Sequence, residues 1–115
     1  MYVDGHINME DEKCSLQYKT DTDKFSKLRC YVFSTQYDAA NCDPLLFNGW
    51  LCALKKKGLL KSDNTLNDVA FQNISLRNKC STDTNFSQAY PNCKSSTMKY
   101  LNILRLLFCL FRAVP

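Results

Sequence analysis

Seven cysteines are the residues of this chain with the clearest chemical potential. They are Cys14, Cys30, Cys42, Cys52, Cys80, Cys93 and Cys109. Cysteines form disulfides, bind zinc or act as nucleophiles. No two of them have the C-x-x-C spacing, and the single histidine, His6, is remote from all of them in the sequence. A structural zinc site is therefore poorly supported, and a nucleophilic Cys–His pair is open only in principle.

The redox state of these cysteines depends on the compartment. In a secreted chain of this size they would indicate a disulfide framework with one cysteine left over, and the sequons Asn73-Ile74-Ser75 and Asn85-Phe86-Ser87 fit that context. Residues 1–6 lack the basic segment and apolar run of a signal peptide. We therefore expect reduced thiols in a cytoplasmic or nuclear protein, with Cys30 and Cys52 acting as small buried hydrophobes.

Four lysines are the candidate contact residues for a partner or a nucleic acid: Lys55, Lys56, Lys57 and Lys61. Lysines can contact phosphates, but three at the end of a helix also complement the negative end of its dipole. The net charge of +4 and the pI near 8.7 are lower than a dedicated nucleic-acid binder usually shows. A solvated patch is the simpler interpretation.

Catalytic patterns are absent from the sequence. It contains no glycine-rich phosphate loop and no H-E-x-x-H, G-x-S-x-G or EF-hand pattern. The acidic residues at positions 10–12, 21 and 23 are expected to form a solvated face in preference to a paired-carboxylate site. We predict a protein that is not an enzyme and needs no metal or cofactor.

The elements that must position these residues are predicted to be helices. The chain has 115 residues, enough for one domain, and only three glycines and three prolines. So few turn-forming residues favour helices joined by polar loops. We expect an all-α single domain of about four to six short helices in a superhelical or orthogonal stack.

The helical domain is predicted to cover residues 1–80, with a weak helix within 1–20 and helices near 23–40, 44–57 and 63–73. The third has the most complete signal: Asp43 is a good N-cap, Pro44 suits the first position, and Gly58 can end the helix. Helical spacing of apolar residues predicts a core. Its expected members are Phe25, Leu28, Val32, Phe47, Trp50, Leu51, Leu54, Leu66 and Val69.

The last third of the chain changes from polar to apolar. Residues 81–97 read as a polar linker because they contain Pro91 and clusters of serine, threonine and asparagine. Residues 98–115 form an apolar C-terminal helix or a foreign tail, and the run over 101–111 is too short to cross a bilayer. Three interpretations stay open: a final core helix, an interfacial or partner-binding helix, or a segment foreign to the domain. No membrane association is predicted.

Three short segments between Phe25 and Ser81 carry a family resemblance. They are Lys27-Leu28-Arg29-Cys30, then the run from Phe47-Asn48 to Leu54-Lys55, then Ile74-Ser75-Leu76 with Lys79-Cys80-Ser81. In order and approximate spacing this half of the chain resembles the C-terminal helical domain of the large Ku subunit, which binds the DNA-dependent protein kinase catalytic subunit. The chain departs from the family at Val69-Ala70-Phe71, where a Phe-Trp pair is usual, and at Cys80, where an acidic residue is common.

The resemblance implies a nuclear helical scaffold that recruits a kinase or another factor in double-strand break repair by end joining. The smaller Ku subunit and DNA would be partners only through a larger parent protein. The family's acidic C-terminal tail has no counterpart, since residues 101–112 are apolar with Arg105 and Arg112. Two alternatives stay open: a nucleic-acid-binding module that uses a stripe formed by Lys55, Lys56, Lys57, Lys61, Arg77 and Lys79, and a secreted cysteine-rich effector.

Overall fold

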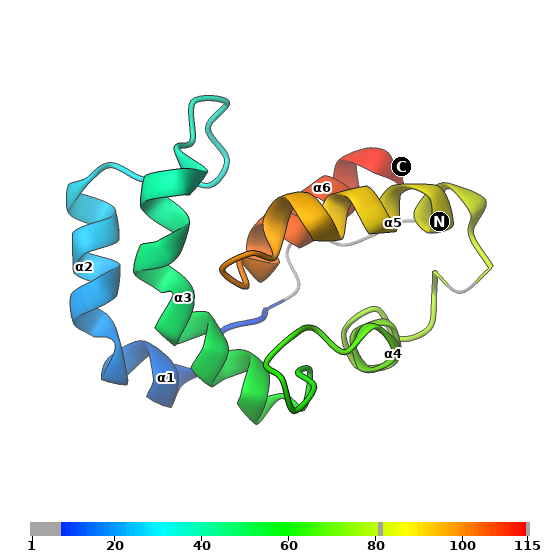
Figure 1. Ribbon diagram of the computed structural model, residues 1–115, viewed down its shortest axis with the longest axis horizontal. Helices are drawn as coiled ribbons and strands as arrows, with labels where there is room; N and C mark the ends of the chain where they lie inside the picture. Colours follow the sequence, from blue (N-terminus) through cyan, green and yellow to red (C-terminus); the bar gives the residue numbers. More distant parts are fainter. Residues whose placement is uncertain (1–7, 81, 115) are drawn as a thin grey trace.

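The computed structural model describes residues 8–80 and 82–114, and these residues form an all-α domain (Figure 1). Its helices are α1 (Glu12–Gln17), α2 (Lys19–Lys27), α3 (Ala39–Lys56), α4 (Asp68–Ala70), the π-helix η1 (Phe71–Ser75), α5 (Thr84–Thr97) and α6 (Ile103–Ala113). The predicted fold class is confirmed. The weak helix predicted within 1–20 corresponds to α1, while residues 1–7, including His6, lie outside the described residues.

Side chains of Asp and Asn begin five of the helices. Each accepts a hydrogen bond from a backbone N–H three residues later, which satisfies an otherwise unpaired donor of the first turn. These N-caps are Asp11 for α1, Asp38 for α3, Asn67 for α4, Asp83 for α5 and Asn102 for α6.

The start predicted for α3 is wrong by about one turn. The N-cap is Asp38 and not Asp43, so Pro44 lies inside the helix instead of at its first position. The Asp43 side chain is unavailable for capping because it is buried and bonded to Arg105 and Tyr37. The predicted end is close, since α3 stops at Lys56 and Gly58 follows with a φ of 72°.

The helix predicted over 23–40 is also corrected. α2 covers Lys19–Lys27, and Arg29 then takes the left-handed conformation, with a φ of 56°. The Cys30 N–H bonds back to the Phe25 carbonyl, the 6→1 hydrogen bond typical of a helix C-terminus. The chain turns here, and Cys30 lies outside any helix although the predicted helix over 23–40 includes it.

The predicted linker is a helix for most of its length. The structure shows α5 over Thr84–Thr97, and in it Phe86, Tyr90, Cys93 and Thr97 are buried at helical spacing. Pro91 is exposed within this helix, so its lost hydrogen bond is tolerated at the surface. Because most residues of this segment are polar, the sequence did not reveal the row of buried residues along α5.

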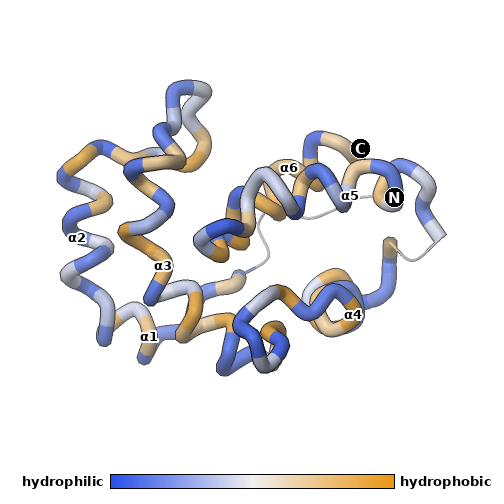
Figure 2. Tube along the Cα trace, in the orientation of Figure 1, coloured by the Kyte–Doolittle hydropathy of each residue, from blue (hydrophilic) through white to orange (hydrophobic). Residues whose placement is uncertain are grey.

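The apolar C-terminal segment is a core helix. Ile103, Leu106, Leu107 and Leu110 of α6 are fully buried, and α6 packs along α5 (Figures 1 and 2). The first of the three interpretations is therefore confirmed for residues 103–113. Within the described residues no helix is both long and apolar enough to cross a membrane.

The predicted core is confirmed in part. Trp50, Leu54 and Leu66 are buried, while Phe25, Val32, Phe47 and Leu51 are partly buried. Two assignments are wrong: Leu28 is 64% exposed and Val69 is 68% exposed. Leu28 falls in the turn that ends α2. The helix predicted over 63–73 starts later, at its Asn67 cap, and this register directs Phe71 and Leu76 inward in place of Val69.

Candidate functional site

Disulfides join six of the seven cysteines. The pairs are Cys14–Cys52, Cys30–Cys42 and Cys93–Cys109, with Cα–Cα distances of 5.8, 5.9 and 5.6 Å. The expectation of reduced thiols, with Cys30 and Cys52 as small buried hydrophobes, is therefore wrong. The disulfides fix α1 to α3, the 28–38 loop to α3, and α5 to α6. Cys80 is the one free thiol, and burial raises its pKa to about 11.

A cavity of about 310 Å³ lies between α1, α2 and α3. Its apolar lining comes from four elements: Phe25 of α2, Val32 of the following loop, Leu46, Gly49, Trp50 and Ala53 of α3, and Leu104 of α6. The Cys14–Cys52 disulfide holds its wall, since Cys14 also lines it. A volume at the lower end of the range for small-molecule sites suits a compact apolar ligand.

Polar groups of the same cavity come mostly from α1 and α2. Ser15, Tyr18, Thr22 and Ser26 contribute hydroxyls, and Glu10 and Asp11 contribute carboxylates. A hydrogen bond from the Cys14 backbone N–H, together with Lys56, lowers the pKa of Asp11. Asp11 is thus charged at neutral pH. The lining can accommodate an apolar body with an uncharged polar end, and it disfavours an anionic one.

Gly49 and Trp50 give the cavity its shape on the α3 side. A Cβ placed on Gly49 would stand 3.9 Å from the Tyr18 Cβ, an ordinary contact distance, so a larger side chain here would enter the space between α3 and the α1–α2 junction. Trp50 is 7% exposed, and its Nε1 has no hydrogen-bond partner among the described residues. The prediction that Trp50 belongs to the core is correct, but the sequence analysis did not predict a cavity. The one sequence signal near the cavity was Gly49, a glycine inside a long helix.

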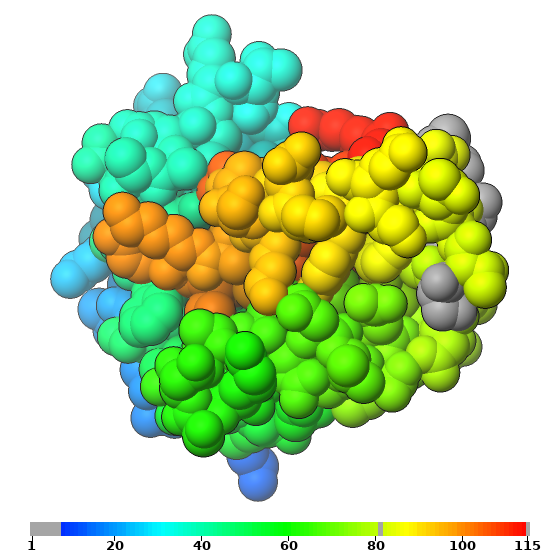
Figure 3. Space-filling model, turned by 45° about the vertical axis from the view of Figure 1, so that its right-hand side comes forward, coloured from blue at the N-terminus to red at the C-terminus, as the bar shows by residue number. Residues whose placement is uncertain are grey.

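A second cavity, with a volume of about 720 Å³, lies between the 63–66 loop and α5. Figure 3 shows the green segment that contains this loop below the yellow and orange surface of α5 and the residues that follow it. Its lining mixes apolar Phe47, Leu66 and Met98 with charged Asp63, Lys94 and Lys99. Lys94 is already paired with Asp68 at 2.9 Å. This lining is less uniformly apolar, and the smaller cavity is the better candidate for an apolar ligand.

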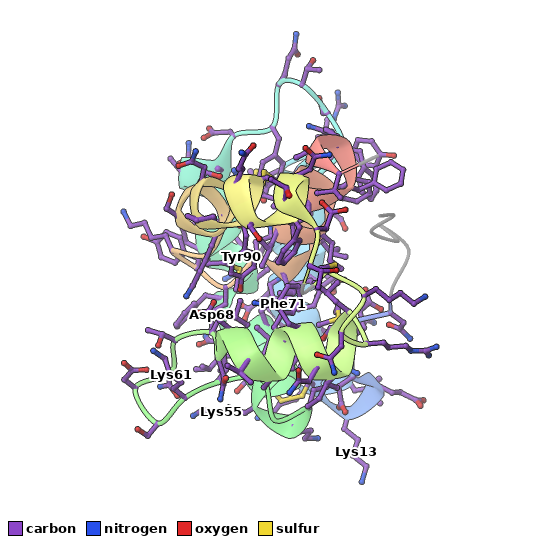
Figure 4. The ribbon with its side chains drawn as sticks, turned by 90° about the vertical axis from the view of Figure 1, so that its right-hand side faces the viewer. Lys13, Lys55, Lys61, Asp68, Phe71 and Tyr90 are labelled. Atoms are coloured by element: carbon purple, nitrogen blue, oxygen red, sulfur yellow. A yellow bond between two sulfur atoms is a disulfide. The ribbon has the colours of Figure 1, made fainter. Side chains whose placement is uncertain are left out.

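Two aspartates organise polar contacts elsewhere in the fold. Asp43 accepts hydrogen bonds from Tyr37, Arg105 and, at 2.8 Å, Asn102, and thereby joins α3 to α6. Asp68 accepts from the Tyr90 hydroxyl at 2.6 Å and from Lys94, and joins α4 to α5 (Figure 4). Burial and the adjacent Asp68 raise the pKa of Tyr90. Both clusters connect helices, and neither lines the 310 Å³ cavity.

The predicted contact lysines lie at the surface. Lys55, Lys56 and Lys61 are exposed and Lys57 is half-buried; Lys55 and Lys61 are labelled in Figure 4. Lys56 is 3.4 Å from Asp11, so part of its charge is compensated. Among the described residues no three His, Cys, Asp or Glu side chains are grouped to hold a metal ion. Comparison with protein-family models, curated proteins and solved structures finds no match for this chain.

Proposed function

We propose that this chain is a secreted, disulfide-stabilised helical protein that binds a small amphipathic molecule in the cavity between α1, α2 and α3. The observation that carries the proposal is the apolar lining of that cavity beside the Cys14–Cys52 disulfide. An apolar concave site with a few polar groups is the usual form of a small-molecule site. Disulfides persist mainly in oxidising compartments, which favours secretion.

The disulfides support a test by thiol titration. Protein purified without reductant should release one reactive thiol when unfolded in denaturant, because only Cys80 is unpaired. Before unfolding it should react slowly, because burial raises its pKa to about 11 and leaves little thiolate at neutral pH. Six or seven reactive thiols would contradict the secreted assignment.

Ligand binding can be measured through the single tryptophan, because Trp50 lines the cavity. Titration with decanol, which has an apolar chain and an uncharged hydroxyl, should change the Trp50 fluorescence in a saturable way. Decanoate has a similar chain and a carboxylate, and it should bind at least tenfold more weakly because Glu10 and Asp11 line the same cavity. Equal binding of the two would contradict the role given to the carboxylates.

Gly49→Leu locates the site. A leucine side chain would project from α3 toward Tyr18 and occupy the cavity, so decanol affinity should fall at least tenfold, about 1.4 kcal/mol. Asn48→Leu is the matched control, because Asn48 is exposed and does not line the cavity. Unchanged binding by Gly49→Leu, measured by fluorescence and confirmed by calorimetry, would place the ligand elsewhere.

The Ku-like scaffold stays a separate proposal. The all-α fold is compatible with it, whereas the disulfides favour a secreted chain. Retention of an end-joining factor from nuclear extract by the immobilised protein would support a nuclear recruitment role. The lysine stripe is likewise a proposal, and it requires salt-dependent binding to DNA or RNA. Neither proposal uses the cavity.

A further inference from the structure

The first sequon lies on the surface of the short π-helix. Asn73-Ile74-Ser75 forms most of η1, and Asn73 is exposed. Ile74, the middle residue of the sequon, is 57% exposed, and Ser75 is half-buried. The three side chains therefore contribute little to the core. An asparagine in this sequence pattern is an acceptor for N-linked glycan in a secreted protein.

Two exposed apolar residues lie near the same asparagine on this helical segment. Val69 is 68% exposed and Ile74 is 57% exposed, and they are among the largest exposed hydrophobic side chains of the described residues. Val69 precedes Asn73 by four residues and Ile74 by five along the continuous helical segment α4–η1, so all three lie within about one turn of it. A sugar chain on Asn73 would shield these apolar side chains from water.

The second sequon has a different environment. In Asn85-Phe86-Ser87 the Phe86 side chain is 3% exposed and packs in the core. The Ser87 Oγ donates a hydrogen bond to the Asp83 carbonyl at 3.1 Å, as part of the first turn of α5. Because its middle residue is buried and its hydroxyl is already engaged, this sequon is the less favourable acceptor of the two.

We propose that Asn73 is an N-glycosylation site and that its glycan covers Val69 and Ile74. In the reaction the Asn73 Nδ2 displaces the diphosphate of a lipid-linked oligosaccharide. A bond forms between Nδ2 and the anomeric carbon, the bond from that carbon to the phosphate oxygen breaks, and one amide proton is lost. The inference rests on the secretory part of the proposed function and not on ligand binding.

The full chain is produced in a eukaryotic cell behind a cleavable secretion leader, and the cell-associated and secreted pools are analysed together. Removal of N-linked glycans by a glycan-releasing amidase should shift the mobility by one glycan and convert Asn73 to aspartate in peptide mass spectra. Asn73→Gln and Ser75→Ala should each abolish the shift. Asn85→Gln and the non-sequon control Asn48→Gln should retain it.

Absence of a shift in the wild-type chain, or a shift lost only in Asn85→Gln, would overturn the inference. Its failure is separable from failure of the proposed function, because decanol binding and the single free thiol are measured on oxidised, glycan-free protein. A solubility readout tests the shielding: Asn73→Gln should aggregate at a lower concentration than wild type. Val69→Ser added to Asn73→Gln should restore solubility.

Discussion

The two ends of the fold use their apolar residues differently. α6 buries Ile103, Leu106, Leu107 and Leu110 completely against the rest of the core. The helices α1 and α2 bury little, and α2 has no buried residue and is mainly hydrophilic (Figure 2). They are attached to α3 around a cavity and fixed by Cys14–Cys52. Close packing stabilises the pair formed by α5 and α6. Beside the cavity, where packing is less complete, the Cys14–Cys52 disulfide holds α1 to α3.

Removal of the Cys14–Cys52 disulfide should have the largest effect. The bond spans 38 residues, for which loop closure predicts about 4 kcal/mol of the free energy of unfolding. A Cys14→Ser, Cys52→Ser variant should lose this stability and its decanol binding together, since α1 is then free to leave the cavity. The same substitutions at Cys93 and Cys109, whose sequence separation is 16, should cost about 3 kcal/mol and leave binding in place. Denaturant unfolding and Trp50 fluorescence measure both effects, and equal loss of binding in the two variants would contradict the comparison.

Leucine truncation in each region tests packing directly. Leu107→Ala removes a fully buried side chain and should cost about 3 kcal/mol in urea unfolding. Leu46→Ala removes a partly buried side chain beside an existing cavity, and should cost about 1 kcal/mol while enlarging the site. A cost for Leu46→Ala as large as that for Leu107→Ala would show that the N-terminal helices are as tightly packed as α6.

The two aspartate clusters should differ from each other, because one aspartate is buried and the other is exposed. Asp43→Asn should cost about 2 kcal/mol, since the Asp43 side chain is 5% exposed and Arg105 loses its counter-charge. Asp68→Asn should cost less than about 1 kcal/mol, because the Asp68 side chain is 44% exposed and solvent screens its pair with Lys94. Urea unfolding at neutral pH compares the two variants, with the exposed Asp23→Asn as a control.

The contribution of Asp68 to the free energy of unfolding should depend on pH. Burial opposes ionisation of Asp68, but the hydrogen bonds from Lys94 and Tyr90 outweigh it and lower its pKa below 3.8. A lowered pKa stabilises the folded state above the ordinary aspartate value, and this stability is lost as the pH falls through the folded-state value. The gap in unfolding free energy between wild type and Asp68→Asn should therefore be constant from neutral pH to about pH 5 and close below pH 4. A gap that widens on acidification would contradict the assignment.

Local sequence signals predicted the all-α class, the body of α3 and the burial of Trp50 and Leu54, because helical spacing and end signals act within a few residues. They failed where contacts between residues far apart in the sequence determine the structure. Asp43 resembles an N-cap until Arg105 and Asn102, about 60 positions away, engage it. Polar composition around Pro91 concealed the stripe of Phe86 and Tyr90. Gly49 alone did not predict the cavity, because the cavity depends on how α1 and α2 are placed against α3.

The buried thiol of Cys80 affects which cysteine pairs persist during folding. Thiol–disulfide exchange proceeds through the thiolate, and with a pKa of about 11 only about one Cys80 in ten thousand is ionised at pH 7. In the unfolded chain the same thiol is ordinary and can attack wrongly formed bonds until the core closes over it. Once the native disulfides have formed, folding buries the Cys80 thiol and stops it from exchanging with them. The chain therefore retains its disulfide pattern although Cys80 has no partner.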